Sequence, residues 1–152
     1  MSEARQYCSF HVDDLLFGVE VQVVQEVIRY QEMTRVPLAG AEIGGLINLR
    51  GQIVTAVSLR KQLQLPDLEG GKLPMNVVIR TDDAAVSLLV DEIGDVLQLE
   101  SDTYEPPPET LTGVSRELIL GVHKLKGRLL LILDTVAAVN LGNRPLEAAE
   151  AA

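Results

Sequence analysis

The chain has 152 residues, of which 47% are hydrophobic and 3% aromatic, and its 13 basic and 22 acidic residues give a formal net charge of −9. This charge disfavours nucleic acid and anionic membranes as partners, because both are bound by clustered Lys and Arg. Cys8 is the only cysteine, no secretory signal follows Met1, and no apolar run can cross a bilayer, so we expect a soluble cytoplasmic protein without direct membrane insertion.

The first half of the chain alternates between strand and turn patterns. Residues 6–12 alternate apolar and polar side chains, and Cys8 lies on the apolar face, where a thiol acts as a small hydrophobe. Asp13 and Asp14 predict a turn before a strand over residues 15–21. The further expected elements are a short helical turn leading into a strand at residues 23–28, a loop at 37–40, a hairpin of strands 43–49 and 52–59, and a short helix at 60–65.

The second half repeats this kind of pattern after an exposed loop over residues 67–74. The expected strands are residues 76–80, 85–90, 118–124 and 128–133, with a turn at Asp82-Asp83 and a proline loop from Pro106. Asp134 is placed to cap a short helix that reaches Leu141. Residues 143–152 are polar and alanine-rich, and we expect a frayed tail there.

Two stretches of the chain read as copies of one another. Residues 45–54 and 121–130 align without a gap at an offset of 76 (121 − 45), and each carries a glycine in a predicted hairpin turn, where φ is positive. Upstream, residues 17–28 match 86–97 at an offset of 69 (86 − 17), so the second copy has seven extra residues (76 − 69). We therefore expect an all-β domain over residues 6–142, made of two small barrels from copies at about 10–65 and 79–141.

The sequence offers little support for catalysis. His11 and His123 lie at unrelated places in the repeat, and each is interpreted as a solvated surface side chain. Asp91 and Glu92 fit either a solvated loop or half of an ion pair. No metal-binding, nucleophile or phosphate-loop motif is present, so we expect no catalytic residues, no metal site and no cofactor.

Arg50 stands at the tip of the first predicted hairpin. It is interpreted either as a turn residue in solvent or as the partner of a carboxylate. The second copy has Lys126 there, which keeps the charge but not the planar fork that binds a carboxylate through two parallel hydrogen bonds.

Residues 45–54, Gly-Leu-Ile-Asn-Leu-Arg-Gly-Gln-Ile-Val, followed by Leu59-Arg60, resemble the signature of the CheW coupling proteins of bacterial chemotaxis. The resemblance covers residue 6 to about 141. Its other matches are Val24-Gln25-Glu26-Val27-Ile28-Arg29, Thr34-Arg35-Val36-Pro37, Leu89-Val90-Asp91-Glu92-Ile93 and Ile119-Leu120-Gly121-Val122. Thr55 and Ser58 depart from the proline and the acidic or amide residue that the family usually has, which leaves the subtype open.

The resemblance implies two intertwined five-stranded SH3-like barrels and a non-enzymatic adaptor. Such proteins bind the cytoplasmic hairpin tip of a chemoreceptor in a groove between the barrels. They also bind the regulatory domain of the histidine kinase CheA, and further CheW copies in rings at membrane-bound receptor arrays. The alternatives are an adaptor of a related chemosensory system that controls pili or development, and a small-ligand binding or hydrolytic protein built on a doubled barrel.

Two sets of site residues follow from these matches. The receptor groove is expected to contain Val24, Glu26, Ile28, Arg50 and Val86, with Val24 and Val86 partly exposed and the neighbouring Val27 in the core. The kinase contact is expected at Gly45, Leu46, Ile47, Asn48 and Leu49, with Leu46 and Ile47 exposed. Arg50 is expected to pair with Glu26 and to hold the Val24–Ile28 segment against the hairpin tip.

Overall fold

The computed structural model describes residues 4–40, 42–80, 85–109 and 114–139. Strands dominate, as the alternating sequence patterns predict. In chain order they are β1 (Ala4–Val12), β2 (Leu15–Glu20), β3 (Val24–Ile28), β4 (Ile43–Leu49), β5 (Gln52–Ser58), β6 (Met75–Arg80), β7 (Ala85–Val90), β8 (Glu92–Glu100), β9 (Tyr104–Glu105), β10 (Ile119–Leu125) and β11 (Arg128–Leu133).

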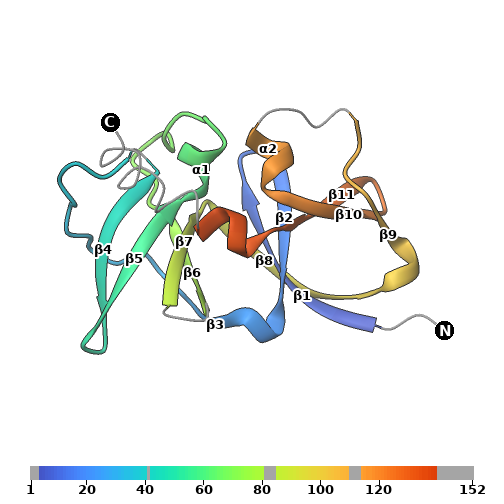
Figure 1. Ribbon diagram of the computed structural model, residues 1–152, viewed down its shortest axis with the longest axis horizontal. Coiled ribbons are helices and arrows are strands. Elements are labelled where there is room, and N and C mark those ends of the chain that lie inside the picture. The colour runs from blue at the N-terminus through green and yellow to red at the C-terminus, as the bar shows by residue number, and fades with distance from the viewer. Residues whose placement is uncertain (1–3, 41, 81–84, 110–113, 140–152) are drawn as a thin grey trace.

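The two copies of the repeat exchange strands. One sheet has the order β8-β1-β2-β11-β10-β9 and the other β3-β6-β7-β5-β4, so the β1–β2 hairpin lies between strands of the second copy and the β6–β7 hairpin between strands of the first. Each sheet contains one parallel strand pair, and the two pairs are equivalent in the repeat. Thr55 pairs with Val86 and Leu131 pairs with Phe17. Leu131 is the counterpart of Thr55 at the offset of 76 (131 − 55), and Val86 is the counterpart of Phe17 at the offset of 69 (86 − 17). The two sheets form the two sides of the molecule (Figure 1). The all-β fold and its intertwined arrangement are thus confirmed.

One sheet has a sixth strand because a loop of the second copy pairs with the hairpin. β9 pairs with β10 through Glu105↔Val122 and Tyr104↔His123. In the first copy the corresponding contact is a single bridge, Thr34↔Leu46.

A shared core holds the two sheets together. Its fully buried members come from both copies, among them Phe10, Phe17, Leu88 and Leu118. A smaller cluster lies within each sheet, one around Ile47 and Val54 and the other around Tyr7 and Leu130. The expected exposure of Val86 is wrong: it is 8% exposed and belongs to the shared core, because every residue of β7 is buried.

Short helical segments connect the strands. The 3-10 helices η1 (Val21–Val23) and η2 (Ser101–Thr103) precede β3 and β9, and η1 is the helical turn predicted before β3. The α-helices are α1 (Leu59–Gln62) and α2 (Val114–Glu117). Ser58 still caps α1, since its side chain accepts a hydrogen bond from the Lys61 amide at 3.3 Å.

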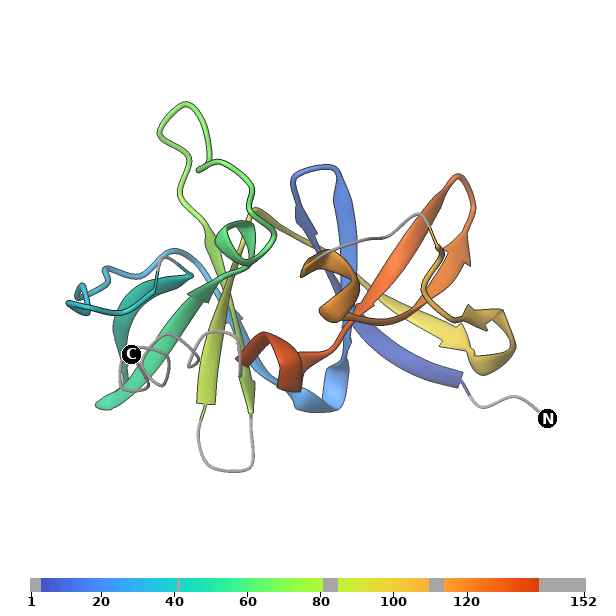
Figure 2. The ribbon, with the colours of Figure 1, turned by 45° about the horizontal axis from the view of Figure 1, so that its top comes forward.

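A last helical segment covers residues 135–139. The Asp134 carboxylate accepts a hydrogen bond from the Ala137 amide at 3.0 Å, as the capping prediction requires. This segment lies between the two sheets (Figure 2). The predicted Asp82-Asp83 turn and the predicted tail lie outside the described residues.

Candidate partner-binding site at the β4–β5 hairpin

The β4–β5 hairpin ends in a two-residue turn made of Arg50 and Gly51. Their φ angles are 53° and 88°, so both lie in the left-handed region that a type I′ turn requires. The Asn48 side chain stabilises the turn by accepting a hydrogen bond from the Gly51 amide at 2.8 Å. In the second hairpin Gly127 has a positive φ of 81°, but Lys126 does not. The two hairpin turns therefore differ in backbone conformation, and of their two basic residues only Arg50 has a left-handed backbone.

The predicted contact between Arg50 and Glu26 is present. The Arg50 Nη1 donates to Glu26 Oε2 at 2.8 Å and Nη2 donates to Oε1 at 3.0 Å, which is the parallel bidentate geometry. Glu26 lies on β3 and Arg50 follows β4, and these strands are the two edges of the five-stranded sheet. The ion pair therefore ties the two edges of this sheet together at the hairpin tip.

The exposure of the two side chains limits what this pair contributes to stability. The Arg50 side chain is 78% exposed and the Glu26 side chain 16%. Because Arg50 is so exposed, the pair belongs with surface salt bridges worth about 0–1 kcal/mol. The equivalent residues in the second copy, Asp95 (26 + 69) and Lys126 (50 + 76), form no ion pair in the described part of the chain. The main consequence of the pair is that it fixes the position of the hairpin tip relative to β3.

β3 presents a partly apolar edge beside this ion pair. Val24 is partly buried against the shared core, and Ile28 is partly buried against the cluster around Ile47. Val27 is 38% exposed, so its expected place in the core is wrong. The structure therefore brings Val24, Glu26, Ile28 and Arg50 together and leaves Val86 away from the surface.

β4 turns alternate side chains inward, which divides the expected kinase contact into two groups. Gly45 and Ile47, which point inward, are buried, whereas Asn48, which points outward, is exposed; Leu46 and Leu49 are both half-buried. The expected exposure of Ile47 is wrong, since only 1% of it is exposed.

The strand opposite β4 supplies an exposed apolar residue that sequence reasoning missed. Ile53 lies directly across from Asn48 and is 62% exposed. Successive side chains of a strand point to opposite faces, so the buried Val54 and Ala56 imply that Ile53 points outward. This alternation could have predicted its exposure.

The small size of Gly45 has an intramolecular explanation. Its φ is +151°, and a Cβ atom there would lie 2.8 Å from both the Met33 Cβ and the Thr34 carbonyl oxygen. The Thr34 and Leu46 backbones exchange two hydrogen bonds of 2.8 Å at this point. Gly45 thus allows the loop after β3 to close over β4.

A second ion pair, between Arg60 and Asp91, joins the two halves. The Arg60 Nε and Nη2 atoms donate to the two Asp91 oxygens at 2.8 and 2.9 Å, and the hydrogen bond with Asp91 raises the pKa of Arg60. The Asp13 amide also donates to Asp91, at 2.6 Å. α1, the β7–β8 junction and the β1–β2 turn therefore meet at one carboxylate, and Asp91 is half of an ion pair rather than a solvated loop residue.

The interpretation of His123 as a surface residue is wrong. It is 1% exposed, and its ring lies 5.4 Å from the rings of both Tyr7 and Tyr104. Burial lowers the pKa of His123 and raises the pKa of the partly buried Cys8. Among the described residues, no group of three or more His, Cys, Asp or Glu is placed to hold a metal ion. A search of the same residues finds no helix with the length and apolar character needed to span a membrane.

The exchanged sheets and the hairpin-tip ion pair define a duplicated, interlocked β module. The CheW-like domain model matches residues 6–141, and the chain belongs to the CheW family. It is 34% identical to the chemotaxis protein CheW of Bacillus subtilis over 134 residues, covering 86% of this chain and 84% of that protein. It is 28% identical to the chemotaxis protein CheW of Treponema pallidum over 136 residues, covering 87% and 80% of the two chains.

The fold is also similar to a solved structure, that of the scaffolding protein TtCheW from Thermoanaerobacter tengcongensis. The TM-score is 0.78 at 23% sequence identity, and the match covers 87% of this chain and 90% of the other. This likeness supports the arrangement of the two sheets.

Proposed function

We propose that this protein is a non-catalytic adaptor of bacterial chemotaxis that couples chemoreceptors to the histidine kinase CheA at membrane-bound receptor arrays. Membership of the CheW family carries the proposal. The bidentate Arg50–Glu26 pair supports it, because it fixes the most family-like hairpin against β3. An adaptor acts by holding partners in a defined geometry, and a pair of this kind restrains the relative position of two binding elements.

The receptor hairpin tip binds along β3. Val27 is exposed there, Val24 and Ile28 are partly exposed, and Glu26, which pairs with Arg50, lies between them on the strand. An apolar edge beside a fixed ion pair suits the apolar stripe of a receptor helix.

The CheA regulatory domain binds the outer face of the β4–β5 hairpin. Leu46, Asn48 and Ile53 form this face, whereas Ile47 supports it from inside the sheet. The exposed Ile53 is the apolar anchor, because a large aliphatic residue surrounded by polar neighbours gains most when a partner covers it.

Reconstitution with a matching receptor fragment and CheA tests the coupling role. Adding the protein should raise receptor-controlled CheA autophosphorylation, while the protein alone has no turnover. Unchanged kinase output over a full titration contradicts the proposal. The receptor and kinase that co-purify from cells decide between a flagellar system and a related system for pili or development.

Single charge substitutions map the two surfaces. Val27→Asp should weaken receptor binding by ~1–3 kcal/mol, as expected for a central contact, while Leu73→Asp, at a 60% exposed loop position, should leave it unchanged. Ile53→Asp should weaken CheA binding, and Leu129→Asp, at the equivalent position of the second hairpin (53 + 76), is its matched comparison. Loss of CheA binding in the Leu129 variant alone moves the kinase contact to the second hairpin.

A further inference from the structure

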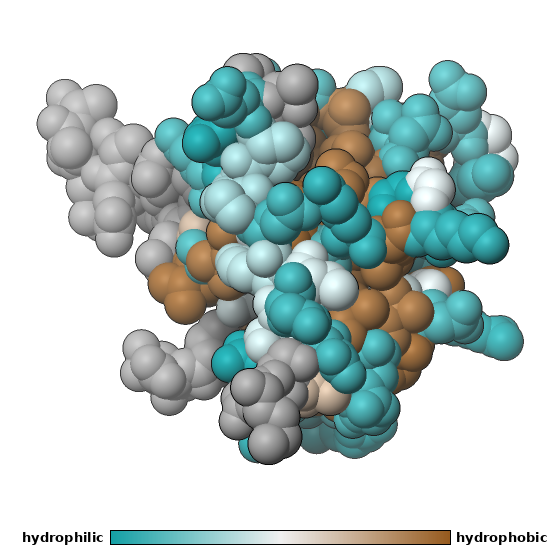
Figure 3. Space-filling model, turned by 90° about the vertical axis from the view of Figure 1, so that its right-hand side faces the viewer, coloured by the Kyte–Doolittle hydropathy of each residue, from teal (hydrophilic) through white to brown (hydrophobic). Residues whose placement is uncertain are grey.

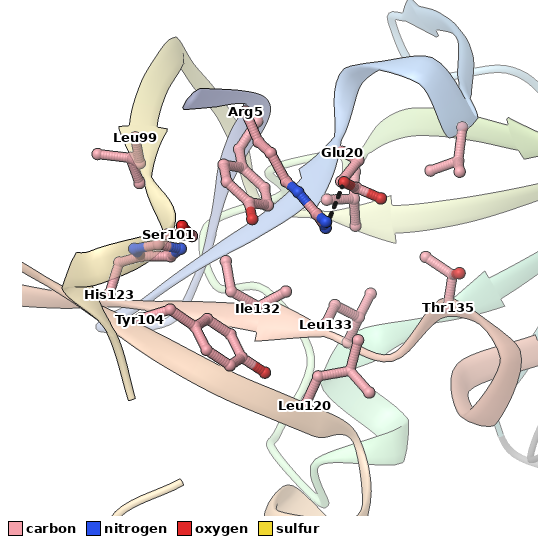
Figure 4. Close-up of a pocket in the computed structure, with 13 residues that line it drawn as sticks. Arg5, Glu20, Leu99, Ser101, Tyr104, Leu120, His123, Ile132, Leu133 and Thr135 are labelled. Atoms are coloured by element: carbon pink, nitrogen blue, oxygen red, sulfur yellow. Dashed lines mark hydrogen bonds and ion pairs between the residues drawn. The ribbon is translucent and has the colours of Figure 1, made fainter. Parts of the chain in front are cut away.

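The six-stranded sheet contains a cavity that neither proposed partner surface includes. It has a volume of about 380 Å³, within the usual range of small-molecule sites. Side chains from β1, β2, β8, β9, β10 and β11 line it, among them Tyr7, Glu20, Leu99, Tyr104, Leu120 and His123. The labelled side chains of Glu20, Leu99, Tyr104, Leu120 and His123 surround a common space (Figure 4). Apolar surface lies between hydrophilic side chains on this side of the molecule (Figure 3).

The first copy of the repeat is an internal comparison, because the equivalent interior there has different side chains and a smaller cavity, of about 250 Å³, lined by Met33, Gly44 and Leu89 among others. His123 stands where the first copy has Ile47 (123 − 76), and Glu20 stands where the second copy's β7 has Leu89 (20 + 69). Ile47 and Leu89 are 1% and 6% exposed and belong to one apolar cluster. Two apolar side chains of one half are thus replaced by two polar ones beside the larger cavity.

The residue that covers the equivalent glycine also differs between the copies. A Cβ at Gly45 would meet Met33, whereas a Cβ at Gly121 would meet the ring of Tyr104. Met33 packs into its apolar cluster, but Tyr104 is 42% exposed and forms one wall of the cavity. Both halves therefore have a cavity at this place, and the one beside Glu20 and His123 is the larger of the two.

The hydrogen bonds of His123 determine what kind of group its free nitrogen prefers. The Thr103 hydroxyl lies 2.9 Å from the Glu100 carbonyl oxygen and 2.8 Å from His123 Nδ1. Both contacts are satisfied only if the hydroxyl donates to Glu100 and His123 Nδ1–H donates to Thr103. Burial lowers the pKa of His123 and so favours the neutral ring, in which Nε2 carries a lone pair; this nitrogen is a buried acceptor with no partner among the described residues.

The second polar group beside the cavity is the carboxylate of Glu20. Glu20 Oε1 accepts a hydrogen bond from Arg5 Nη1 at 3.1 Å, and the two side chains are 30% and 55% exposed (Figure 4). The residues around the cavity thus include two acceptors, the partly exposed Glu20 carboxylate and the buried His123 Nε2, beside the rings of Tyr7 and Tyr104. The net charge of −9 adds a field that favours cations and repels anions.

We propose that this cavity is a binding site for a small amphipathic molecule with an apolar body and a hydrogen-bond-donating head, an organic amine or alcohol. The apolar body lies against Leu99, Leu120 and Ile132. The head binds Glu20, and it reaches His123 Nε2 when the partly exposed Tyr104 ring turns outward.

Titration of the intact protein with three molecules of equal chain length tests the head group. Hexylamine, hexanol and hexanoate share one apolar tail, so differences among them report the head. In NMR spectra, hexylamine or hexanol should shift the His123, Tyr7 and Tyr104 ring signals saturably, and hexanoate should bind at least about tenfold more weakly, as repulsion from acceptors implies. No saturable shift with either donor, or equal binding of hexanoate, overturns the proposal.

Residues from the equivalent positions of the first copy provide the matched variant. Glu20→Leu combined with His123→Ile should remove binding of hexylamine and hexanol while the backbone amide spectrum stays native, and Leu129→Ser is the control outside the cavity. If the double variant does not fold, Leu120→Trp narrows the cavity from its 54% exposed rim and should weaken binding. Unchanged affinity in the folded variant overturns the proposal without touching the adaptor function, whose surfaces lie elsewhere.

Discussion

Removing the Asp91 carboxylate should destabilise the protein strongly, because it leaves a largely buried guanidinium unpaired. The Arg60 and Asp91 side chains are 14% and 12% exposed. Asp91→Ala removes two hydrogen bonds from Arg60, of 2.8 and 2.9 Å, and the acceptor of the Asp13 amide. Each of these contacts joins segments that are far apart in the chain.

The size of the effect follows from burial. Breaking a buried pair by removing one partner costs ~3–5 kcal/mol, whereas an exposed pair is worth about 0–1 kcal/mol. Arg60 keeps its hydrogen bond to the Pro66 carbonyl oxygen at 2.6 Å and lies 3.6 Å from an Asp13 oxygen, so we expect the lower end, about 3 kcal/mol. A domain of this size would lose about 6–12 °C in Tm, at roughly 2–4 °C per kcal/mol.

Urea unfolding followed by circular dichroism measures this loss. Lys61→Gln is the matched control on the same helix, because the Lys61–Asp67 pair of 2.9 Å has side chains 37% and 79% exposed. The control should change the free energy of unfolding by less than about 1 kcal/mol. If Asp91→Ala lowers the free energy of unfolding by no more than the control does, the reasoning that burial makes the Arg60–Asp91 pair strongly stabilising is refuted.

Three further predictions concern single residues. Arg50→Lys should impair receptor-controlled kinase activation yet lower the free energy of unfolding by no more than about 1 kcal/mol, because the fork to Glu26 is lost while the charge remains; normal activation contradicts it. Burial lowers the pKa of His123, so below about pH 7 the unfolded state binds more protons than the folded state does. Unfolding free energy should therefore fall as the pH is lowered from about 7 through the unfolded pKa near 6.5, and His123→Gln should flatten this dependence; equal slopes contradict it. Gly45→Ala should lower Tm more than Gly51→Ala, because a Cβ at Gly45 meets backbone within 2.8 Å and one at Gly51 meets nothing within 4 Å; equal Tm losses contradict it.

The strands and hairpins could be predicted from the sequence, but the exchange between copies could not be derived from the pattern. A repeat of 76 residues (121 − 45) specifies equivalent strands, and each strand has the same alternation whichever copy supplies its neighbour. The parallel pair of β5 with β7 crosses from one copy to the other, as does that of β11 with β2. The resemblance to the CheW family, rather than periodicity, supplied the intertwined arrangement.

The errors in the candidate site have a common physical origin. Val86 was expected at the surface, but β7 is covered on both faces, so its apolar run marks a central strand instead of a binding edge. Ile47 was expected outside, although its alternation with Asn48 places it inward. Single-residue exposure depends on which face the other sheet covers, and that information lies in the partner strands.

His123 carries the most instructive difference, because the residue equivalent to it in the repeat was misplaced in the same way. Position 123 is equivalent to Ile47 (123 − 76); both side chains were expected at the surface, and both are only 1% exposed. The backbone of both halves keeps the same hairpin, with the register shift at equivalent positions, Ile43/Gly45 and Ile119/Gly121. A duplicated scaffold therefore tolerates different interiors, since packing within each sheet is separate from the shared core. One half accordingly fixes a hairpin through Arg50 and Glu26, while the other places Glu20 and His123 beside a cavity.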